Sequence, residues 1–500
     1  MARDMSIPSP LLARLRSAVA LTPLLALPLA LLVTFLVYFP SLNDFFVFHD
    51  FIHIQGIRST GVGEYAQRVL DPSDGGESLF NTGKLYRPVY YLALLADYKA
   101  FGLDPLGYHL VNLFLHLLNV VLVWLIATRL TRSAVAAAVA ALVYGIHPAY
   151  IDAPAWISAI TEVLLATFSL GAIYLFMRSL EARGAAAGLL YLGSFFSAVL
   201  ALGSREPGAA IFLILPAYYF LAFRPADWRQ WREWLRFAPF FAVLAVWALV
   251  RLGVTRDVAS GEGTPGVGKL GWHMFINMFK FNGWAVVPVF SQVGAWVPVA
   301  TGVAAIAVLR LSEQLLRKGS GAARFVVAWW YLAILPYSTQ ATWLLAGRYM
   351  YAGMAAFAVA CGMFVVWLAE ASWVGNLPRL PRWPWPAIAR ATAAGAVAVA
   401  AVILVVGAVH REDTFSRGSE EAHALLNQLQ AQYPTLPAGS TLHVVDPPAS
   451  TIFLDTPLFL EPEVRLYYPG LAKVDFLSQD QLPKLRESLG ENEFVFTYEP

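Results

Sequence analysis

Long apolar runs recur along the chain from residue 20 to residue 409, and the polar stretches between them are too short to form soluble domains. A run of about 20 apolar residues is long enough to cross a hydrocarbon core of roughly 30 Å as a helix. Hydrophobic residues make up 58% of the chain and charged residues 14%, whereas an ordinary soluble domain has roughly 45–50% and 25%. The sequence therefore predicts an α-helical polytopic membrane protein.

We expect about 11 transmembrane helices, each long enough to reach across the hydrocarbon core. They are expected near residues 20–40, 106–128, 133–147, 156–177, 187–203, 206–222, 237–252, 297–310, 325–341, 349–370 and 391–409. Two further stretches, 88–103 and 272–290, fit this topology only as interfacial or re-entrant helices. Counting either one as a span would invert the orientation of everything that follows it.

Arginine clusters set the expected orientation. With the amino terminus inside, the cluster from Arg224 to Arg236 and the pair Arg317 and Lys318 fall in cytoplasmic loops, as the positive-inside rule requires. The first run has no small-residue cleavage site at its end, so we expect a retained anchor rather than a cleaved signal. The carboxyl-terminal tail then lies outside.

Three parts follow from this topology: a membrane unit at residues 1–409, within it a long polar first outer loop at 41–87, and a small extracytoplasmic α/β domain at 410–500. Loops as long as the first one usually have a function. In the tail, the segments STLHVVDPP, EVRLYYPG, AKVDFL and NEFVFTYE predict short strands.

Charge and motifs narrow the function. The net charge of +2 suggests no nucleic-acid partner, and the single cysteine, Cys361, excludes an intrachain disulfide and a cysteine-based metal site. No histidine pair has zinc-binding spacing. No G-x-S-x-G elbow, Walker A loop or dinucleotide fingerprint stands in its required context. Hydrolase, nucleotidase and oxidoreductase activities therefore lose support.

The unusual polar residues near the span ends fall mostly on the outer side. An ionisable residue at membrane depth is energetically costly and is a candidate for function. Asp50 lies among apolar and aromatic residues in FVFHDFIHI, where we expect its pKa to rise toward that of a useful base. Glu162 and Glu206 are explained equally well as ion-pair partners of neighbouring arginines. The outer set is Asp44, His49, Asp50, Arg87, His109, His147, Asp152, Glu162, Arg205, Glu206, Arg348 and Tyr349.

Three stretches resemble a known family: YRPVYYLALLADYKAFGLDPLGYHLVNLFLHLLNVVLVWLIATRL, HPAYIDAPAWISAITEVLLATF and ALGSREPG. They are similar to the membrane half of the transmembrane-and-tetratricopeptide O-mannosyltransferases and their bacterial relatives. That family lies in the GT-C superfamily of membrane glycosyltransferases, which also includes the protein O-mannosyltransferases. The similarity is strongest over residues 86–210 and returns at AGRYMYAG around Arg348. The tail lacks the family's tetratricopeptide repeats, which leaves the sugar and the acceptor open.

The resemblance implies a GT-C-like fold for residues 1–409 and transfer of a sugar from a polyprenyl-phosphate donor on the extracytoplasmic face. It implies Asp50 as the general base, although many members have two adjacent acids where this chain has His49 followed by Asp50. Arg205 and Arg348 would neutralise the leaving phosphate, and a single displacement would invert the anomeric carbon. Supporting or substrate-binding roles fall to His49, Arg87, His109, His147, Asp152, Glu162, Glu206 and Tyr349.

Other functions stay open. A lipid or glycan flippase would also have many spans, although the broken-helix repeats of secondary transporters are not seen. An inactive scaffold is a second alternative, and a polymerase or ligase that uses a polyprenyl-diphosphate donor is a third.

The expected partners are a polyprenyl-phosphate-linked sugar, a glycan, lipid or protein acceptor, and membrane lipids. No cofactor is specified, and a divalent metal, Mg or Mn, is left open. The lack of an N-x-S/T sequon favours a bacterial inner membrane.

Overall fold

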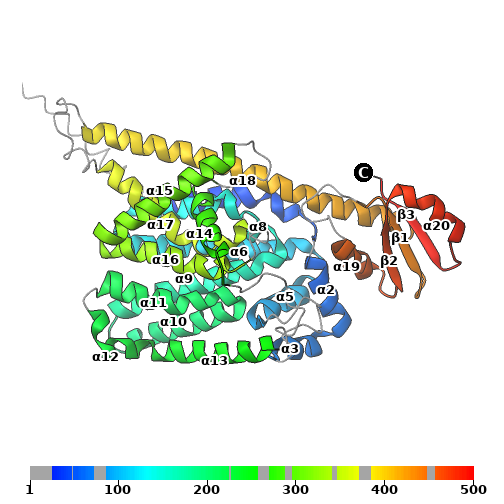
Figure 1. The fold of residues 1–500 in the computed structure, drawn as a ribbon, viewed down its shortest axis with the longest axis horizontal. Coiled ribbons are helices and arrows are strands. Elements are labelled where there is room, and N and C mark those ends of the chain that lie inside the picture. The colour runs from blue at the N-terminus through cyan, green and yellow to red at the C-terminus, as the bar shows by residue number, and fades with distance from the viewer. Residues whose placement is uncertain are drawn as a thin grey trace, which may run out of the picture.

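A computed structural model gives the fold, and it describes residues 25–47, 49–72, 86–224, 227–256, 270–287, 296–340, 346–370, 385–447 and 457–499. Within them, helices form one large bundle, and a small sheet lies beyond it at the carboxyl end (Figure 1). Residues 1–24, which include the start of the first expected span, and residues 73–85 of the first outer loop lie outside the described residues.

Each expected span overlaps a helix. The helices of the bundle are Leu25–Tyr38, α6 (Pro105–Thr131), α7 (Ala134–Ile146), α9 (Ile160–Glu181), α10 (Gly184–Ser204), α11 (Ile211–Tyr218), α13 (Ala238–Arg256), α15 (Trp296–Lys318), α16 (Gly321–Ser338), α17 (Met354–Ala369) and α18 (Trp385–Gln432). Shorter helices connect them: α2 (His49–Thr60), α3 (Val62–Leu70), α5 (Pro88–Phe101), α8 (Asp152–Ala155), α12 (Trp231–Trp234) and α14 (His273–Trp284).

Seven helices of the described part are long and apolar enough to cross a membrane, and shorter apolar helices overlap further expected spans. The polytopic helical class is therefore confirmed, whereas the number of crossings stays a prediction. The stretches 88–103 and 272–290 contain α5, with 14 residues, and α14, with 12. At about 1.5 Å per residue both helices are shorter than a hydrocarbon core of roughly 30 Å.

Small residues allow the helices of the bundle to approach closely. Gly362 of α17 faces the backbone of α7, where a Cβ atom would lie 2.2 Å from the carbonyl oxygen of Ala136. Between α9 and α10, the hydroxyls of Ser194 and Ser197 donate to backbone oxygens of the facing helix, each at 2.8 Å. Inside a membrane the hydrophobic effect contributes little to helix association. Close packing and hydrogen bonds between helices, as seen here, are therefore typical of membrane bundles.

Helix α18 continues beyond residue 409, where we expect the membrane unit to end, and runs without a break to Gln432. Figure 1 shows its carboxyl-terminal part leaving the bundle and reaching the small sheet. Leu425 and Leu429 of α18 pack into the apolar core of that sheet, together with Leu442 and Phe496. The division into domains at residue 409 stays a prediction, although the helix itself crosses it.

The sheet has three parallel strands in the order β2-β1-β3, namely β1 (Thr441–Val445), β2 (Lys473–Leu477) and β3 (Glu493–Thr497). Parallel neighbours need crossover connections, which are usually helical, and α19 (Pro457–Tyr467) and α20 (Leu482–Ser488) lie between successive strands. The small α/β domain is therefore confirmed.

The strand predicted at EVRLYYPG is wrong, because this segment forms the end of α19. Residues 463–467 of this segment are the last turn and a half of the helix, and over so few residues their polarity happens to alternate as in a strand. Arg465 pairs with Glu461 four residues earlier at 2.7 Å, which is a helical contact.

Candidate active site

Asp50 lies in the first turn of α2, and only 1% of its surface is exposed. Its Oδ2 accepts the backbone N–H of Val47 at 3.0 Å. Its Oδ1 accepts the backbone N–H of Ser158 at 2.8 Å and also the Ser158 hydroxyl. Burial raises the pKa of Asp50 to about 7, although these hydrogen bonds favour its charged form. A carboxylate with a pKa near neutrality is suited to act as a base at pH 7.

Two histidines of α2 stand beside this carboxylate in the sequence. The ring of His49 lies 5.8 Å from that of Trp156, and burial lowers the pKa of His49 to about 4, with Arg348 acting in the same direction. His53 Nε2 lies 2.9 Å from the Tyr90 hydroxyl, and burial lowers its pKa to about 3. Both imidazoles are therefore neutral at pH 7, and they offer hydrogen bonds rather than charge.

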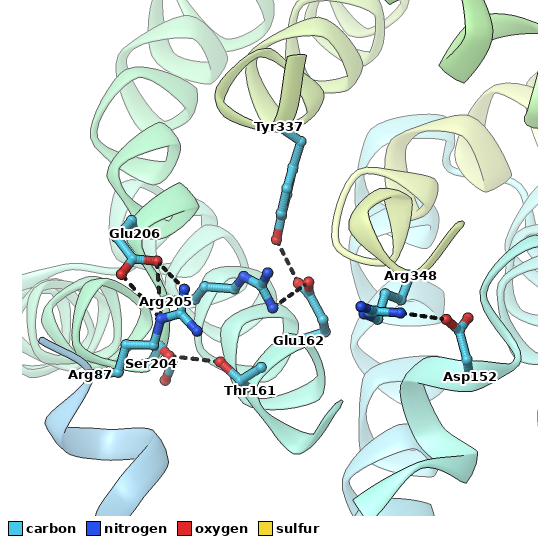
Figure 2. Close-up of polar contacts among 9 residues, drawn as sticks. All are labelled: Arg87, Asp152, Thr161, Glu162, Ser204, Arg205, Glu206, Tyr337 and Arg348. Atoms are coloured by element: carbon cyan, nitrogen blue, oxygen red, sulfur yellow. Dashed lines mark hydrogen bonds and ion pairs between the residues drawn. The ribbon is translucent and has the colours of Figure 1, made fainter. Parts of the chain in front are cut away.

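Arg205 and Glu162 form a buried ion pair at the end of α10 and the start of α9. Arg205 Nη1 lies 2.7 Å from Glu162 Oε1, and the Tyr337 hydroxyl donates to Glu162 Oε2 at 2.5 Å (Figure 2). The guanidinium carbon of Arg205 lies 5.1 Å from the ring centre of Tyr349. Because Glu162 has no exposed surface, its charge depends on this partner, and the pair fixes the orientation of Arg205.

Arg348 lies in the short helix η10 (Gly347–Met350) and pairs with Asp152 of α8. Its Nη1 lies 3.2 Å from Asp152 Oδ2. Its guanidinium carbon lies 5.0 Å from the ring centre of Trp156 and 5.2 Å from that of Tyr349. Tyr349 therefore contacts both predicted phosphate-binding arginines, since Arg205 lies over the same ring.

Arg87 makes the third pair, directly before α5. Its Nε donates to both carboxylate oxygens of Glu206, at 3.1 and 3.0 Å, and its Nη2 donates to Oε2 at 2.7 Å. Two-pronged pairing of this kind is the strongest geometry open to arginine and a carboxylate. Figure 2 shows the pair next to Arg205, on the side away from Arg348.

Three predicted arginines and three predicted carboxylates thus form a row of ion pairs (Figure 2). Asp50 is linked to this row through the turn that carries Ser158 and Trp156. From the sequence, Glu162 and Glu206 could either act in the chemistry or pair with arginines, and both lie in ion pairs. Each predicted phosphate-binding arginine pairs with a carboxylate and also lies over an aromatic ring. A phosphate would therefore meet guanidinium groups that are already fixed in place, which lowers the entropic cost of binding.

Two predicted site histidines contact backbone instead of this row. His109 Nε2 lies 3.2 Å from the carbonyl oxygen of Asp44, so it ties α6 to the segment before α2. His147 Nε2 lies 3.1 Å from the carbonyl oxygen of Ala285, and its Nδ1 accepts the N–H of Ala149 at 3.3 Å. Both histidines therefore fix the backbone around the site.

A close backbone contact positions Arg348. A Cβ atom at Gly347 would lie 1.7 Å from the carbonyl oxygen of Ala149, in the short helix η2 (Pro148–Tyr150). Only glycine permits this approach, and it brings Arg348 next to the turn that carries Asp152.

The ligand requirements of a divalent metal can be compared with these residues. Mg²⁺ and Mn²⁺ prefer several carboxylate or carbonyl oxygens around one point. Within the described ranges, no group of three or more His, Cys, Asp or Glu side chains could hold a metal ion. Both carboxylate oxygens of Asp50 already accept hydrogen bonds. The involvement of a divalent metal stays untested, and the mechanism below is written with the residues of the chain alone.

Sequence reasoning missed two residues of the site. Ser158 donates twice to Asp50, and Tyr337 contacts both members of the Arg205–Glu162 pair. Both lie in apolar segments, where a single serine or tyrosine is common. One feature of the sequence could have indicated Ser158. It lies two residues after Trp156, inside a stretch that resembles the known family.

Comparisons with known proteins agree with the resemblance. No protein-family model matches the chain. Over 125 residues, or 25% of the chain, it is 32% identical to Protein O-mannosyl-transferase Tmtc1 of Drosophila melanogaster. Over 147 residues, or 29% of the chain, it is 28% identical to Protein O-mannosyl-transferase F38B6.6 of Caenorhabditis elegans. These matches span 15% and 20% of the two relatives.

A solved structure has a similar fold. The oligosaccharyltransferase of Archaeoglobus fulgidus in the apo form aligns with a TM-score of 0.50 and 12% identity, over 85% of this chain and 62% of that one. ArnT from Cupriavidus metallidurans bound to undecaprenyl phosphate aligns with a TM-score of 0.48 and 16% identity, over 92% and 90%. The curated relatives confirm the similarity to O-mannosyltransferases inferred from the sequence, and the archaeal structure supports the fold alone.

Proposed function

We propose that the chain transfers a sugar from a polyprenyl-phosphate donor to a hydroxyl-bearing acceptor, with Asp50 as general base. The observation that carries the proposal is the buried carboxylate of Asp50, with its pKa near 7, bound to Ser158 in the same turn as Trp156, against which Arg348 lies. The names of the curated relatives support sugar transfer to an oxygen. A lipid-linked donor is consistent with a site built at the ends of apolar helices.

The reaction is a single displacement. The acceptor oxygen attacks the anomeric carbon and forms the new glycosidic bond, while the bond from that carbon to the phosphate oxygen breaks. The electron pair of the broken bond leaves with the phosphate, and the proton of the acceptor hydroxyl goes to Asp50 Oδ1 or Oδ2. Attack from the face opposite the phosphate inverts the anomeric carbon.

Arg205 and Arg348 would bind the phosphate as it becomes more negative. Their guanidinium carbons lie 5.1 and 5.2 Å from the centre of the Tyr349 ring. Fixed cations stabilise developing charge more than mobile ones, because they need no reorganisation during the reaction. Arg87, paired with Glu206, lies next to Arg205 (Figure 2).

The first experiment measures transfer of radiolabelled sugar from a panel of polyprenyl-phosphate and polyprenyl-diphosphate donors, in membranes that contain the wild type or Asp50→Asn. We expect the wild type to use a monophosphate donor and the variant to lose the signal at equal expression. Asp97→Asn is the matched control, since Asp97 is also a buried aspartate but lies in α5.

Each outcome has a consequence. A signal that persists in Asp50→Asn removes Asp50 as the base, and a signal only from diphosphate donors favours the polymerase or ligase. A wild type that is silent with every donor favours the flippase or the scaffold. A bacterial inner membrane with the site on its outer face remains part of the proposal, and labelling of single cysteines from either side of the membrane tests it.

A further inference from the structure

The carboxyl-terminal domain contacts the helix that carries Asp50. Helix α19 packs against α2, as Figure 1 shows beside the sheet. Arg58, in the last turn of α2, donates from Nη1 to the carbonyl oxygen of Leu466 at 2.8 Å. The Leu466 side chain is buried in the same apolar cluster as Phe51 and Ile54 of α2. The contact therefore combines a charged hydrogen bond with apolar packing.

Helix α18 holds the segment directly before α2. The Ser419 hydroxyl accepts the backbone N–H of Phe45. The ring of His423 stacks on that of Phe45, with centres 4.4 Å apart and planes only 9° from parallel. These residues come from the part of α18 that has left the bundle, so both ends of the segment from Phe45 to Arg58 are held by the carboxyl-terminal part of the chain.

The segment that α18 contacts includes residues that lie against Asp50 or its neighbour Phe51. The ring of Phe45 lies 6.0 Å from that of Phe51, the residue that follows Asp50. Val47, in the segment held by α18, supplies the N–H that Asp50 Oδ2 accepts. A shift of this segment would therefore move a hydrogen-bond donor of the carboxylate as well as the start of its helix.

Helix α2 needs such support. It has 12 residues, and isolated helices of about 12–15 residues are marginal in water, so their stability comes from tertiary packing. Tyr90 and Tyr91 of α5 and Leu466 of α19 belong to the same buried apolar cluster as Phe51 and Ile54 of α2. The packing of α2 therefore comes both from the bundle and from α19.

We propose that the carboxyl-terminal domain is a positioning element of the active site, in which α18 and α19 hold the start of α2 so that Asp50 keeps its place. This inference rests on the proposed function, since it assigns the domain a role in that reaction. The alternative is that the same contacts only attach the domain to the bundle.

The test uses Arg58→Ala, His423→Ala and the double variant in the full chain. We expect the double variant to lower kcat by about tenfold or more, because a displacement of about 1 Å can cost up to a hundredfold in rate, while KM for the donor stays within about twofold. Arg58→Lys keeps a donor and should restore most of the rate. Arg310→Ala is the control, since Arg310 is an exposed arginine of α15 paired with Glu313.

Hydrogen–deuterium exchange provides a readout that does not depend on activity. Faster exchange confined to residues 44–60 in the double variant supports the positioning role, even if no donor yields product and the proposed reaction fails. A wild-type kcat in the double variant overturns the inference while leaving the proposed reaction intact. Faster exchange throughout the chain also overturns it, because it indicates a loss of fold rather than a local release of α2.

Discussion

Asp50 and Ser158 are 108 residues apart in the chain, yet Ser158 donates both its backbone N–H and its hydroxyl to Asp50 Oδ1. One oxygen of the candidate base is thus bound by a residue of the turn between α8 and α9. The same turn carries Trp156, against which Arg348 lies. The proposed base and the proposed phosphate-binding arginine therefore share one structural support.

The pH dependence of sugar transfer should report on this contact. A base must be ionised, and burial raises the pKa of Asp50 to about 7, so kcat/KM should fall as the pH falls through about 7. The Ser158 hydroxyl lowers this pKa by favouring the charged form. Ser158→Ala should therefore move the acidic limb to higher pH by roughly one unit, as expected for the loss of one hydrogen bond to a charge.

Ser197→Ala removes a hydroxyl that serves only helix packing and should leave the limb in place. An unshifted limb in Ser158→Ala would contradict the role of Asp50 as the titrating base.

Breaking the Arg205–Glu162 pair should destabilise the protein strongly. Glu162→Ala leaves the Arg205 charge without its buried partner, which typically costs about 3–5 kcal/mol. Glu162→Gln keeps one oxygen that accepts from Arg205, and its amide N–H can donate to the Tyr337 hydroxyl, so its loss should be smaller. Glu313→Ala removes a carboxylate that is 41% exposed and pairs with Arg310 and Arg317, and exposed pairs contribute about 0–1 kcal/mol. Thermal unfolding in detergent measures all three variants, and equal losses for Glu162→Ala and Glu313→Ala would argue against the buried pair.

Arg348→Lys should weaken donor binding although the charge is kept. Lysine lacks the planar face that lies over the rings of Trp156 and Tyr349. It also lacks the forked donors that match a phosphate. KM for the donor should rise roughly tenfold, as expected for the loss of about 1 kcal/mol of cation–π contact and of one phosphate hydrogen bond. Arg417→Lys, in an exposed pair with Asp413, should leave KM unchanged. A normal KM in Arg348→Lys would move the phosphate site elsewhere.

Gly347→Ala should impair the site through the backbone. Its Cβ atom would lie 1.7 Å from the carbonyl oxygen of Ala149, so η10 must shift and take Arg348 with it. Overpacking of this kind costs about 1–3 kcal/mol, and kcat should fall by roughly ten- to a hundredfold.

Gly302→Ala is the control, because nothing lies within 4 Å of a Cβ atom there. It lies inside α15, where alanine should stabilise the helix by roughly 0.5–1 kcal/mol. Equal activity in the two variants would show that Arg348 does not depend on this close contact.

The fold was largely predictable because apolar runs are local signals. Each expected span overlaps a helix, including short ones such as α7. The strand predicted at EVRLYYPG failed because polarity over eight residues does not distinguish a strand from the end of a helix.

The site was predictable only in part. Motif similarity indicated Asp50, Arg205 and Arg348 as site residues. Spacing along the chain, however, does not indicate that Tyr337 lies against Glu162, which is 175 residues away. Ser158 was missed for the same reason. Such contacts depend on how the helices pack, and no residue pattern in a single sequence encodes that.

Helix α18 has 48 residues and joins the bundle to the carboxyl-terminal domain without a break. An α-helix turns by about 100° per residue, since it has 3.6 residues per turn. Inserting one residue after the bundle would therefore swing the whole domain around the helix axis and carry α19 away from α2. Inserting seven residues, almost two full turns, would restore its direction but raise it by roughly 10 Å. Unlike a flexible tether, this helix makes the placement of the domain depend on the number of residues that precede it.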